Sequence, residues 1–513
     1  MTLSYASIEP ITAAIRAARQ TAKRHYGVHP YFTRRPPNVV RTYIEKFTKP
    51  GDRVLDPFGG SGVTAIEALL TNRQGIQSDI NPLANFIASE IADRSYPDTE
   101  YIRRAYAQVE RDSGDLVRSI PRMMDKDIDK ELGRHALPEN VRLPENSDES
   151  NFFDLFTSRQ LLALAVIKHA IDKVQDIPAK RQLLLAWSAT LGKLNKTFLS
   201  AKGRAESRGG SSIFSIYRYK VAKNPVELPP WRIFSERVGN VIAAKEEVLR
   251  EVLYLKSMGK FIGKFECHNE DVSDLCREIE PVDYVFTDPP YGGHIAYLDL
   301  STIWNHWLGF PVPDRIREKE IIVGGDLKKT EESYLRELRQ SIRSTCGILK
   351  KNRWVSIVFQ HWNVAYFEAI LQSAEDAGAE FRSAVTQAGD TIWSMHKKKN
   401  QERVLAGEMI LTFFKGGKNG KTASKDEPLA VSELIDRVLA ELASPGKPIH
   451  GEVLFNRLIV EAWKSRSLGT LRISREDFID ALHQKGWGYD AKQHCWVPKI
   501  GGVQHEPKLW RTA

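Results

Sequence analysis

The stretch DRVLDPFGGSGVTAIEALLTNRQGIQSDI, residues 52–80, decides the fold class of this chain. An apolar strand pattern over 51–56 leads into a glycine-rich turn, a helical pattern over 63–72 and a second strand pattern over 73–82. Strand, glycine turn, helix and strand in this order form a βαβ unit, whose two strands are parallel neighbours in one sheet. The stretch therefore predicts an α/β fold.

The glycine turn after the first strand points to a nucleotide-like ligand. Gly59, Gly60 and Gly62 let the backbone approach a ligand at the N-terminus of the following helix. Asp79 ends the second strand, where a carboxylate can accept hydrogen bonds from ribose hydroxyls. GSGVTA also fits the G-x-G-x-x-A pattern of dinucleotide enzymes, so an NAD-dependent oxidoreductase is an alternative. A tight turn beside a solvated acid is another.

A second acidic strand end occurs in YVFTDPPYGG, residues 284–293. Asp288, Pro289, Pro290 and Tyr291 resemble the DPPY motif of amino-group DNA methyltransferases. The resemblance implies that Asp288 and the carbonyl of Pro289 accept the hydrogens of an exocyclic amine, so that the nitrogen lone pair can turn away from the base ring toward a methyl donor. The prolines would stiffen the turn that holds these acceptors. A paired amine cannot reach such a site, so the base has to leave the duplex, and Tyr291 can stack on it. A simple proline turn is the structural alternative.

These stretches resemble the motifs of amino-group DNA methyltransferases of the DPPY type, the adenine-specific DNA methylases of bacterial restriction and defence loci. DPFGGSG resembles their first motif, DPPY their catalytic motif, and HPYFTRRP (residues 29–36) an N-terminal motif beside the cofactor. The resemblance covers roughly residues 25–415 and implies S-adenosylmethionine as cofactor.

The resemblance also assigns individual residues. Asp56 is expected near the methionine amino group of the cofactor, and Asp271 near its adenine amino group, although a helix cap explains Asp271 equally well. The implied cofactor residues are Tyr31, Phe32, Asp56, Phe58, Gly59, Gly60, Gly62, Asp79, Ile80, Asn81 and Asp271, and the implied catalytic residues are Asp288, Pro289, Pro290 and Tyr291.

The full prediction is a Rossmann-like S-adenosylmethionine-dependent methyltransferase sheet with a large helical insert and a small C-terminal module, held to be a winged helix. Residues 1–96 and 261–415 are expected to form the catalytic domain, 97–260 the insert and target-recognition region, and 428–513 the C-terminal module. Residues 7–25 are predicted to be helical. A glycine- and lysine-rich linker, KGGKNGKTASKDEP, precedes the module.

Residues 202–223, KGRAESRGGSSIFSIYRYKVAK, form a basic segment with interleaved aromatic side chains. Its cations can neutralise DNA phosphates, although a solvated basic loop is the simpler alternative. The predicted nucleic-acid contacts are Lys202, Arg204, Arg208, Arg218, Lys220 and Lys223.

Composition narrows the cellular setting. The chain has 513 residues, a formal charge of +9 and 42% hydrophobic residues, which suits a globular protein with a polyanionic partner. Four scattered cysteines without a C-x-x-C pair argue against disulfides and a zinc ribbon, so no metal is expected. The absence of a long apolar run and of a signal peptide predicts a cytoplasmic protein.

The sequence thus predicts methyl transfer to DNA, with double-stranded DNA and companion restriction or defence proteins as partners. Adenine N6 is favoured because cytosine-N4 members of the family more often have serine where Asp288 stands. Cytosine N4, RNA, the oxidoreductase and a catalytically silent DNA-binding module remain alternatives. The DPPY turn argues against hydride transfer, which has no use for paired amine acceptors.

Overall fold

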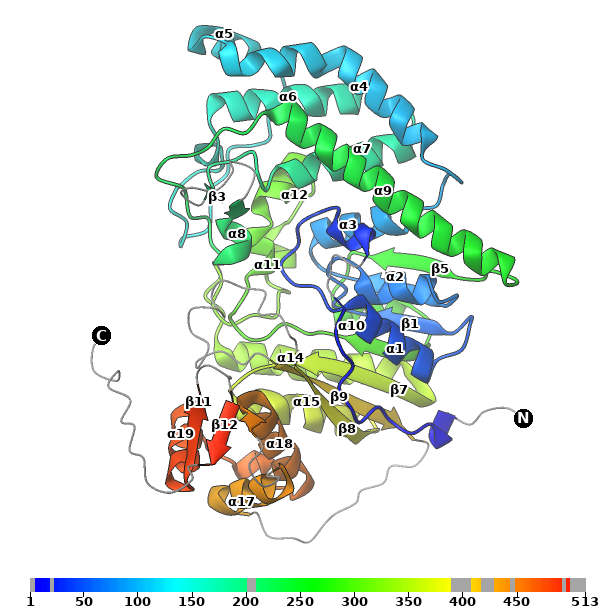
Figure 1. Cartoon of the computed structure of the whole chain (residues 1–513), viewed down its shortest axis with the longest axis vertical. Coiled ribbons are helices and arrows are strands. Elements are labelled where there is room, and N and C mark those ends of the chain that lie inside the picture. Colours follow the sequence, from blue (N-terminus) through cyan, green and yellow to red (C-terminus); the bar gives the residue numbers. More distant parts are fainter. Residues whose placement is uncertain are drawn as a thin grey trace.

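The computed structural model describes residues 5–18, 23–200, 209–388, 407–416, 429–442, 448–490 and 495–498. Its centre is a seven-stranded sheet in the order β5-β2-β1-β6-β7-β9-β8 (Figure 1). Neighbouring strands are parallel except at β9, which runs antiparallel to both β7 and β8. The strands are β1 (Arg53–Asp56), β2 (Gln74–Ser78), β5 (Lys264–His268), β6 (Val282–Thr287), β7 (Leu349–Phe359), β8 (Ala379–Ala388) and β9 (Gly407–Lys415).

The predicted βαβ unit is confirmed. Helix α2 (Val63–Leu69) joins β1 to β2, which pair in parallel with Val54 opposite Gly75. A Cβ atom on Gly75 would lie only 2.0 Å from the carbonyl oxygen of Ala65 in α2. The helix therefore packs on the strand at a distance that only glycine permits.

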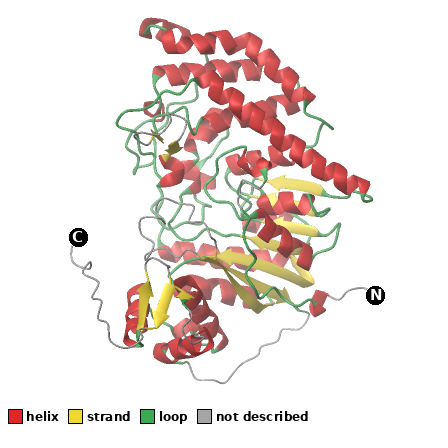
Figure 2. Cartoon of the chain, in the orientation of Figure 1, coloured by secondary structure: helices red, strands yellow, loops and turns green. Residues whose placement is uncertain are grey.

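Helices cover both faces of the sheet (Figure 2). The strands alternate between two cores: Tyr284 and Phe286 of β6 join the hydrophobic cluster on one face, and Val285 joins the cluster on the other. The first face carries α1 (Pro37–Phe47), α2 and α3 (Pro82–Ala92), and the second carries α10 (Val272–Glu278), α14 (Glu331–Ile348) and α15 (Val364–Asp376).

The chain between β2 and β5 is largely helical, and its buried side chains join the same core as those of α1–α3. A short ladder, β3 (Phe198–Ser200) with β4 (Gly209–Ser211), interrupts these helices. Three short helices follow β6: α11 (Tyr297–Leu300), α12 (Thr302–Leu308) and α13 (Asp314–Arg317). The helices between β2 and β5, after α3, are α4 (Glu100–Ser119), α5 (Asp125–Leu132), α6 (Ser158–Asp172), α7 (Ile177–Thr190), α8 (Ser212–Ser215) and α9 (Pro230–Ser257).

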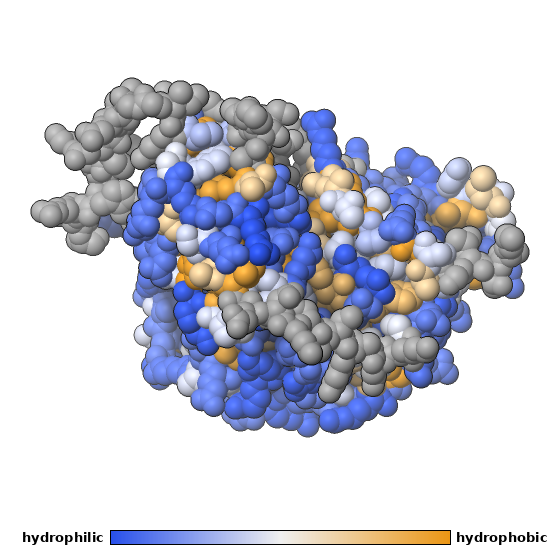
Figure 3. Space-filling model, turned by 90° about the horizontal axis from the view of Figure 1, so that it is seen from below, coloured by the Kyte–Doolittle hydropathy of each residue, from blue (hydrophilic) through white to orange (hydrophobic). Residues whose placement is uncertain are grey.

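The C-terminal part packs against the second core, where Trp362 meets Phe455 with ring centroids 4.6 Å apart. The sequence of residues 473–487 predicts a capping box of Ser474 and Asp477, that of residues 488–498 predicts a hairpin, and both are present. The winged-helix assignment stays a prediction. Figure 3 views this end of the molecule, whose visible surface is mostly hydrophilic. Its elements are α17 (Val431–Leu442), α18 (Gly451–Lys464), α19 (Arg475–Gln484), β10 (Ile449–His450), β11 (Trp487–Asp490) and β12 (Cys495–Pro498).

The prediction of a helix over 7–25 was wrong for the described part of that segment. Only two short 3-10 helices, Tyr5–Ser7 and Arg24–Gly27, occur there. Residues 11–15 run past β8, where the Ser383 hydroxyl donates to the Ile11 carbonyl at 3.0 Å and the Ile15 N–H donates to Gln387 at 3.2 Å. These partners replace the internal hydrogen bonds of a helix.

Two observations concern whole-chain expectations. All four cysteines are free thiols. Within the described ranges, no helix combines the length and apolar character that a membrane span requires.

We expect Gly75→Ala to lower the free energy of unfolding by about 1–3 kcal/mol or more, because the added methyl overlaps backbone that cannot move alone. Chemical denaturation would measure this. Gly239→Ala is the matched control, since Gly239 lies inside α9 with nothing within 4 Å of its Cβ position and should be neutral or stabilising. Equal stability of the two variants would contradict the close packing of α2 on β2.

Candidate functional site

The site lies where the strand order of the sheet reverses. β1 pairs with β2 on one side and with β6 on the other, although β6 lies more than 200 residues further along the chain. In open α/β sheets this crevice, outside the carboxyl ends of the strands, is where ligands bind. Asp56 ends β1 and Asp288 follows β6, so the topology brings the two predicted acids to one edge.

Side chains from β2, α3 and the N-terminal motif pack closely against the glycine loop. A Cβ on Gly59 would lie 2.5 Å from the Gln77 side chain, and one on Gly62 would lie 2.6 Å from Ala88. Gly60 has a φ of +50°, and its Cβ position is 3.2 Å from the ring of Tyr31. The loop thus sits between β2 and the predicted N-terminal motif, in a conformation that favours glycine.

Asp56 fastens the loop to the sheet. Its carboxylate accepts hydrogen bonds from the hydroxyls of Thr64 and Thr287, both at 2.8 Å, and from the N–H of Phe58 at 3.1 Å. Burial raises the pKa of Asp56 to about 7. The side chain therefore joins β1, β6 and α2 in addition to lining the cavity.

Asp79 also has a local role that the sequence did not indicate. Its two carboxylate oxygens accept from the N–H groups of Gly60 at 2.9 Å and Asn81 at 2.8 Å. Burial raises the pKa of Asp79 to about 6. Because Asp79 and the carbonyl of Gly59 take the N–H groups of Gly60 and Gly62, these glycines offer close approach more than hydrogen-bond donors.

Asp271 caps a helix, as one of its two sequence interpretations held. One oxygen accepts from the N–H groups of Ser273 and Asp274 at the start of α10, and the other pairs with Lys319 at 2.5 Å. The side chain nevertheless lines the same cavity as the glycine loop. Asp271 can cap α10 and bind a ligand in the cavity at the same time, since a carboxylate has about four acceptor sites.

The DPPY turn holds a polar cluster. The Tyr291 hydroxyl donates to Asp288 at 2.5 Å, and Arg35 Nε donates to the other carboxylate oxygen at 2.6 Å. Arg35 also pairs with Glu408 at the start of β9. Burial raises the pKa of Asp288, while Arg35 opposes this effect. The Tyr334 hydroxyl holds the turn from α14 by donating to the Pro290 carbonyl at 2.7 Å.

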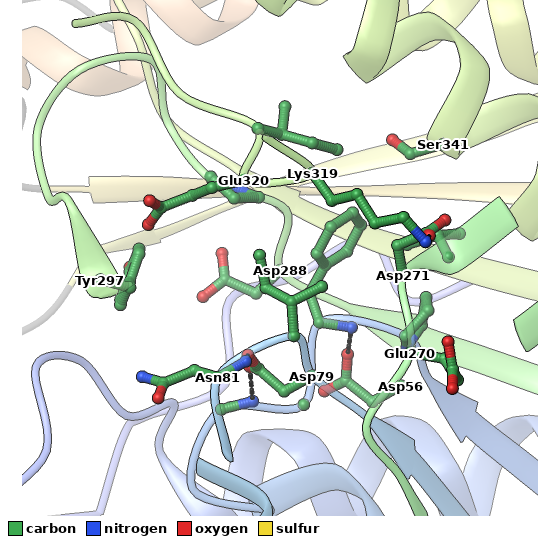
Figure 4. Close-up of a pocket in the computed structure, with 18 of the residues that line it drawn as sticks. Asp56, Asp79, Asn81, Glu270, Asp271, Asp288, Tyr297, Lys319, Glu320 and Ser341 are labelled. Carbon is green, nitrogen blue, oxygen red and sulfur yellow. Dashed lines mark hydrogen bonds and ion pairs between the residues drawn. The ribbon is translucent and has the colours of Figure 1, made fainter. Parts of the chain in front are cut away.

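A single cavity of about 750 Å³ connects the glycine loop to the DPPY turn. In Figure 4, Asp288 lies at the centre, Asp56 and Asp79 lie below it, and Tyr297 and Glu320 lie to one side. Of the predicted site residues, those lining the cavity are Tyr31, Asp56, Phe58, Gly59, Gly60, Asp79, Ile80, Asn81, Asp271, Asp288 and Pro290.

Phe32, Gly62, Pro289 and Tyr291 are not among the lining residues. Phe32 packs edge-on against Tyr297, with ring centroids 5.6 Å apart. Tyr291 packs in the same way against Phe359, at 5.0 Å. In this structure the ring of Tyr291 thus supports the turn from behind.

Sequence reasoning did not select Arg35, Lys319 or Glu320, which also line the cavity. Glu320 accepts from the Leu298 N–H at 3.1 Å, and burial raises the pKa of Glu320 to about 8, so it is mostly protonated at neutral pH. For Arg35 a signal existed, since two arginines follow the aromatic pair of the N-terminal motif after a single threonine. Lys319 and Glu320 come from a loop without a recognisable pattern.

The basic segment falls partly outside the described residues, which include neither Lys202, Arg204 nor Arg208. Lys220 and Lys223 are exposed, and Arg218 pairs with Asp148 at 2.7 Å. Tyr219 is buried instead, and its hydroxyl donates to the Leu300 carbonyl at 2.7 Å. The two tryptophans after the DPPY turn, Trp304 and Trp307, are also buried.

No group of three or more metal-ligating side chains occurs in the ranges that the structure describes. The polar lining of the cavity combines carboxylates with cations, and several of the carboxylates pair with arginine, lysine or backbone N–H groups. The cationic lining residues are Arg34, Arg35, Lys319, Arg336, Arg339 and Arg343.

Comparison with known proteins relates the chain to methylases. Residues 13–93 match the family model described as DNA methylase. The type II methyltransferase M.MjaII of Methanocaldococcus jannaschii is 21% identical over 427 residues, which cover 72% of this chain and 78% of that protein. M.MvaI of Kocuria varians is 23% identical over 330 residues, covering 60% of this chain and 63% of that protein. M.XycI of Xanthomonas campestris pv. cyanopsidis is 45% identical over 56 residues, or 11% of this chain and 18% of that protein.

We expect Asp56 to contribute to the pH dependence of the free energy of unfolding. Because its pKa rises from 3.8 to about 7 on folding, the folded state favours the protonated carboxyl and loses stability as pH rises through this window. Relative to the wild type, Asp56→Asn should therefore gain on the order of 3 kcal/mol between about pH 4 and pH 7.

Denaturant unfolding at several pH values would measure this difference. Asp115→Asn is the control, because Asp115 is fully exposed on α4 and its replacement should show no such trend. A constant difference between Asp56→Asn and wild type across the window would contradict the burial of this carboxyl.

Proposed function

Because the chain belongs to the amino-group DNA methyltransferases, we propose that it transfers the methyl group of S-adenosylmethionine to the exocyclic amine of a base flipped out of DNA. N6 of adenine is the proposed target. The observation that carries this proposal is the single cavity shared by the glycine loop of β1 and the DPPY turn of β6, with Asp288 between them.

The residues around the glycine loop fit the proposed cofactor. Tyr31 and the glycines leave a close-fitting wall for a flat, partly apolar ligand, and Asp79 and Asp271 supply acceptors for ribose and amine groups. When bound, S-adenosylmethionine supplies an electrophilic methyl group on a sulfonium. The N–H groups of Gly60 and Gly62, which a pyrophosphate would need as donors, are already bound to Asp79 and to the Gly59 carbonyl, and this supports the cofactor against NAD.

Asp288 is proposed to act on the target amine. An exocyclic amine is a weak nucleophile because its lone pair is delocalised into the base ring. Asp288 and the Pro289 carbonyl would accept its two hydrogens and so aim the lone pair at the methyl carbon, and the proton released after transfer would pass to Asp288 or to water. The Tyr334 contact keeps the turn rigid.

The base itself needs a platform once it has left the duplex. Tyr297 lines the cavity beside Asp288, and we propose it as the stacking partner, because the Tyr291 ring packs against Phe359 outside the lining. Glu320, protonated at neutral pH, lies on the same side and offers a donor to an edge of the base. This geometry would serve adenine N6 and cytosine N4 alike, so the preference for adenine rests on Asp288 and cytosine N4 is the second candidate.

The remaining proposals concern the rest of the chain. Helices α4–α9, inserted between the two halves of the sheet, are proposed to form the target-recognition region, with Lys220 and Lys223 exposed for contact with DNA phosphates. The C-terminal module is proposed to be a winged helix. Companion restriction or defence proteins and a cytoplasmic location complete the proposal.

Cofactor identity can be tested by calorimetry. We expect saturable binding of S-adenosylmethionine and none of NAD, with Asp79→Ala weakening the cofactor at least about tenfold, since it removes an acceptor and frees the loop N–H of Gly60. Asp79→Asn, which keeps one acceptor oxygen, should lose less. Saturable NAD binding without S-adenosylmethionine binding would refute the proposed cofactor.

Asp288→Ala tests the proposed chemistry. Loss of one preorganised acceptor should slow methyl transfer on the order of a hundred- to a thousandfold while cofactor affinity stays close to wild type. Single-turnover assays with tritiated cofactor and DNA would measure the rate. Asp314→Ala removes an exposed acid from α13 and should keep full activity. Wild-type rates in Asp288→Ala would show that the turn is only structural.

A further inference from the structure

Arg35 occupies the place at Asp288 that the target amine is proposed to take. Its guanidinium donates to Asp288 Oδ2 at 2.6 Å and to the Tyr291 hydroxyl at 3.1 Å, and the Tyr291 hydroxyl donates to Asp288 Oδ1. Asp288 Oδ2 faces both Nε and Nη2 of the guanidinium, which fill its two acceptor sites, whereas Oδ1 has one donor. A base amine can bind Oδ2 only if the guanidinium moves.

The guanidinium of Arg35 also resembles the exocyclic amine that would displace it from Asp288. Like an exocyclic amine on a base ring, it presents N–H donors in the plane of a delocalised group. Its side chain lines the cavity and is only 13% exposed, so its pair with Asp288 is largely desolvated and is stronger than a surface ion pair. The Arg35–Asp288 contact is thus strong enough to compete with the amine of a ligand for the carboxylate.

Glu408 is a second acidic partner that can hold Arg35 when Asp288 does not. Arg35 Nη1 pairs with Glu408 of β9, while Nε and Nη2 face Asp288. If the side chain turns away from Asp288, its charge stays paired with Glu408, so opening the site does not leave an unpaired buried cation. Two acceptors on either side of one guanidinium provide two positions for it.

We propose that Arg35 is a displaceable occupant of the amine-binding site: it holds Asp288 until an exocyclic amine takes its place, and it then rests on Glu408. Thymine, which has no exocyclic amine, has no donor of this kind to offer to Asp288. Arg35 thereby acts as a positioning residue that keeps Asp288 covered until an amine displaces it, so every amine-bearing base binds Asp288 at the cost of the Arg35 contact. The inference rests on the proposed function of Asp288.

The test compares binding of fluorescently labelled single-stranded oligo(dA), oligo(dC) and oligo(dT) by anisotropy, with S-adenosylhomocysteine saturating. Backbone contacts are common to all three strands, whereas only the first two carry exocyclic amines. We expect Arg35→Ala to raise affinity for oligo(dA) or oligo(dC), relative to oligo(dT), on the order of tenfold over wild type. Arg35→Lys, which keeps a cation but not the fork of donors, should raise it less.

Two further variants make the result specific. Adding Asp288→Ala to Arg35→Ala should abolish the gain, because the freed acceptor is then missing. Arg382→Ala removes an exposed arginine of β8 that pairs with Glu380, and it should leave the ratio unchanged. An equal change for all three strands, a fall in the ratio, or a gain that survives Asp288→Ala would overturn the proposal.

The binding test does not depend on catalysis, so the two proposals can fail separately. If wild-type protein transfers no methyl group to DNA, the proposed function fails, while the oligonucleotide ratios still decide the role of Arg35. If methyl transfer occurs but the ratios do not respond to Arg35→Ala, only the present inference fails.

Discussion

The hydrogen bond from Thr287 to Asp56 joins positions 231 residues apart and closes the centre of the sheet. It depends on the parallel pairing of β1 with β6, which places Leu55 opposite Val285. Without this pairing the glycine loop and the DPPY turn would belong to unrelated parts of the chain. The same carboxyl also binds Thr64 of α2, so the strand ends and the loop cannot shift independently.

A buried charge network attaches the inserted helices to this centre. Glu67 of α2 is fully buried and accepts from Lys23, Arg41 and Tyr26, while Glu251 of α9 shares the two cations. A buried carboxylate is costly unless its acceptors are filled, so these partners have one favourable arrangement. The network therefore joins the long helix α9 to α1 and α2.

Much of this fold could be predicted from the sequence. The βαβ unit, the acidic strand ends and the C-terminal hairpin each depend on residues that are close together in the chain. The expectation for residues 7–25 failed because partners on β8, such as Ser383, lie far away in sequence. The same reason hid Arg35, whose contacts with Asp288 and Glu408 join three distant segments. Periodicity cannot report such contacts.

The acids of the site show how structural and chemical roles coexist in one side chain. Asp79 and Asp271 each accept hydrogen bonds from nearby backbone N–H groups, which fixes the orientation of their carboxylates. Each side chain still lines the cavity. Asp288 differs, because its donors are the side chains of Arg35 and Tyr291, which can rotate away without breaking the backbone structure. Fixed acceptors suit recognition of a cofactor, whereas a carboxylate with exchangeable donors suits a substrate that must enter and leave.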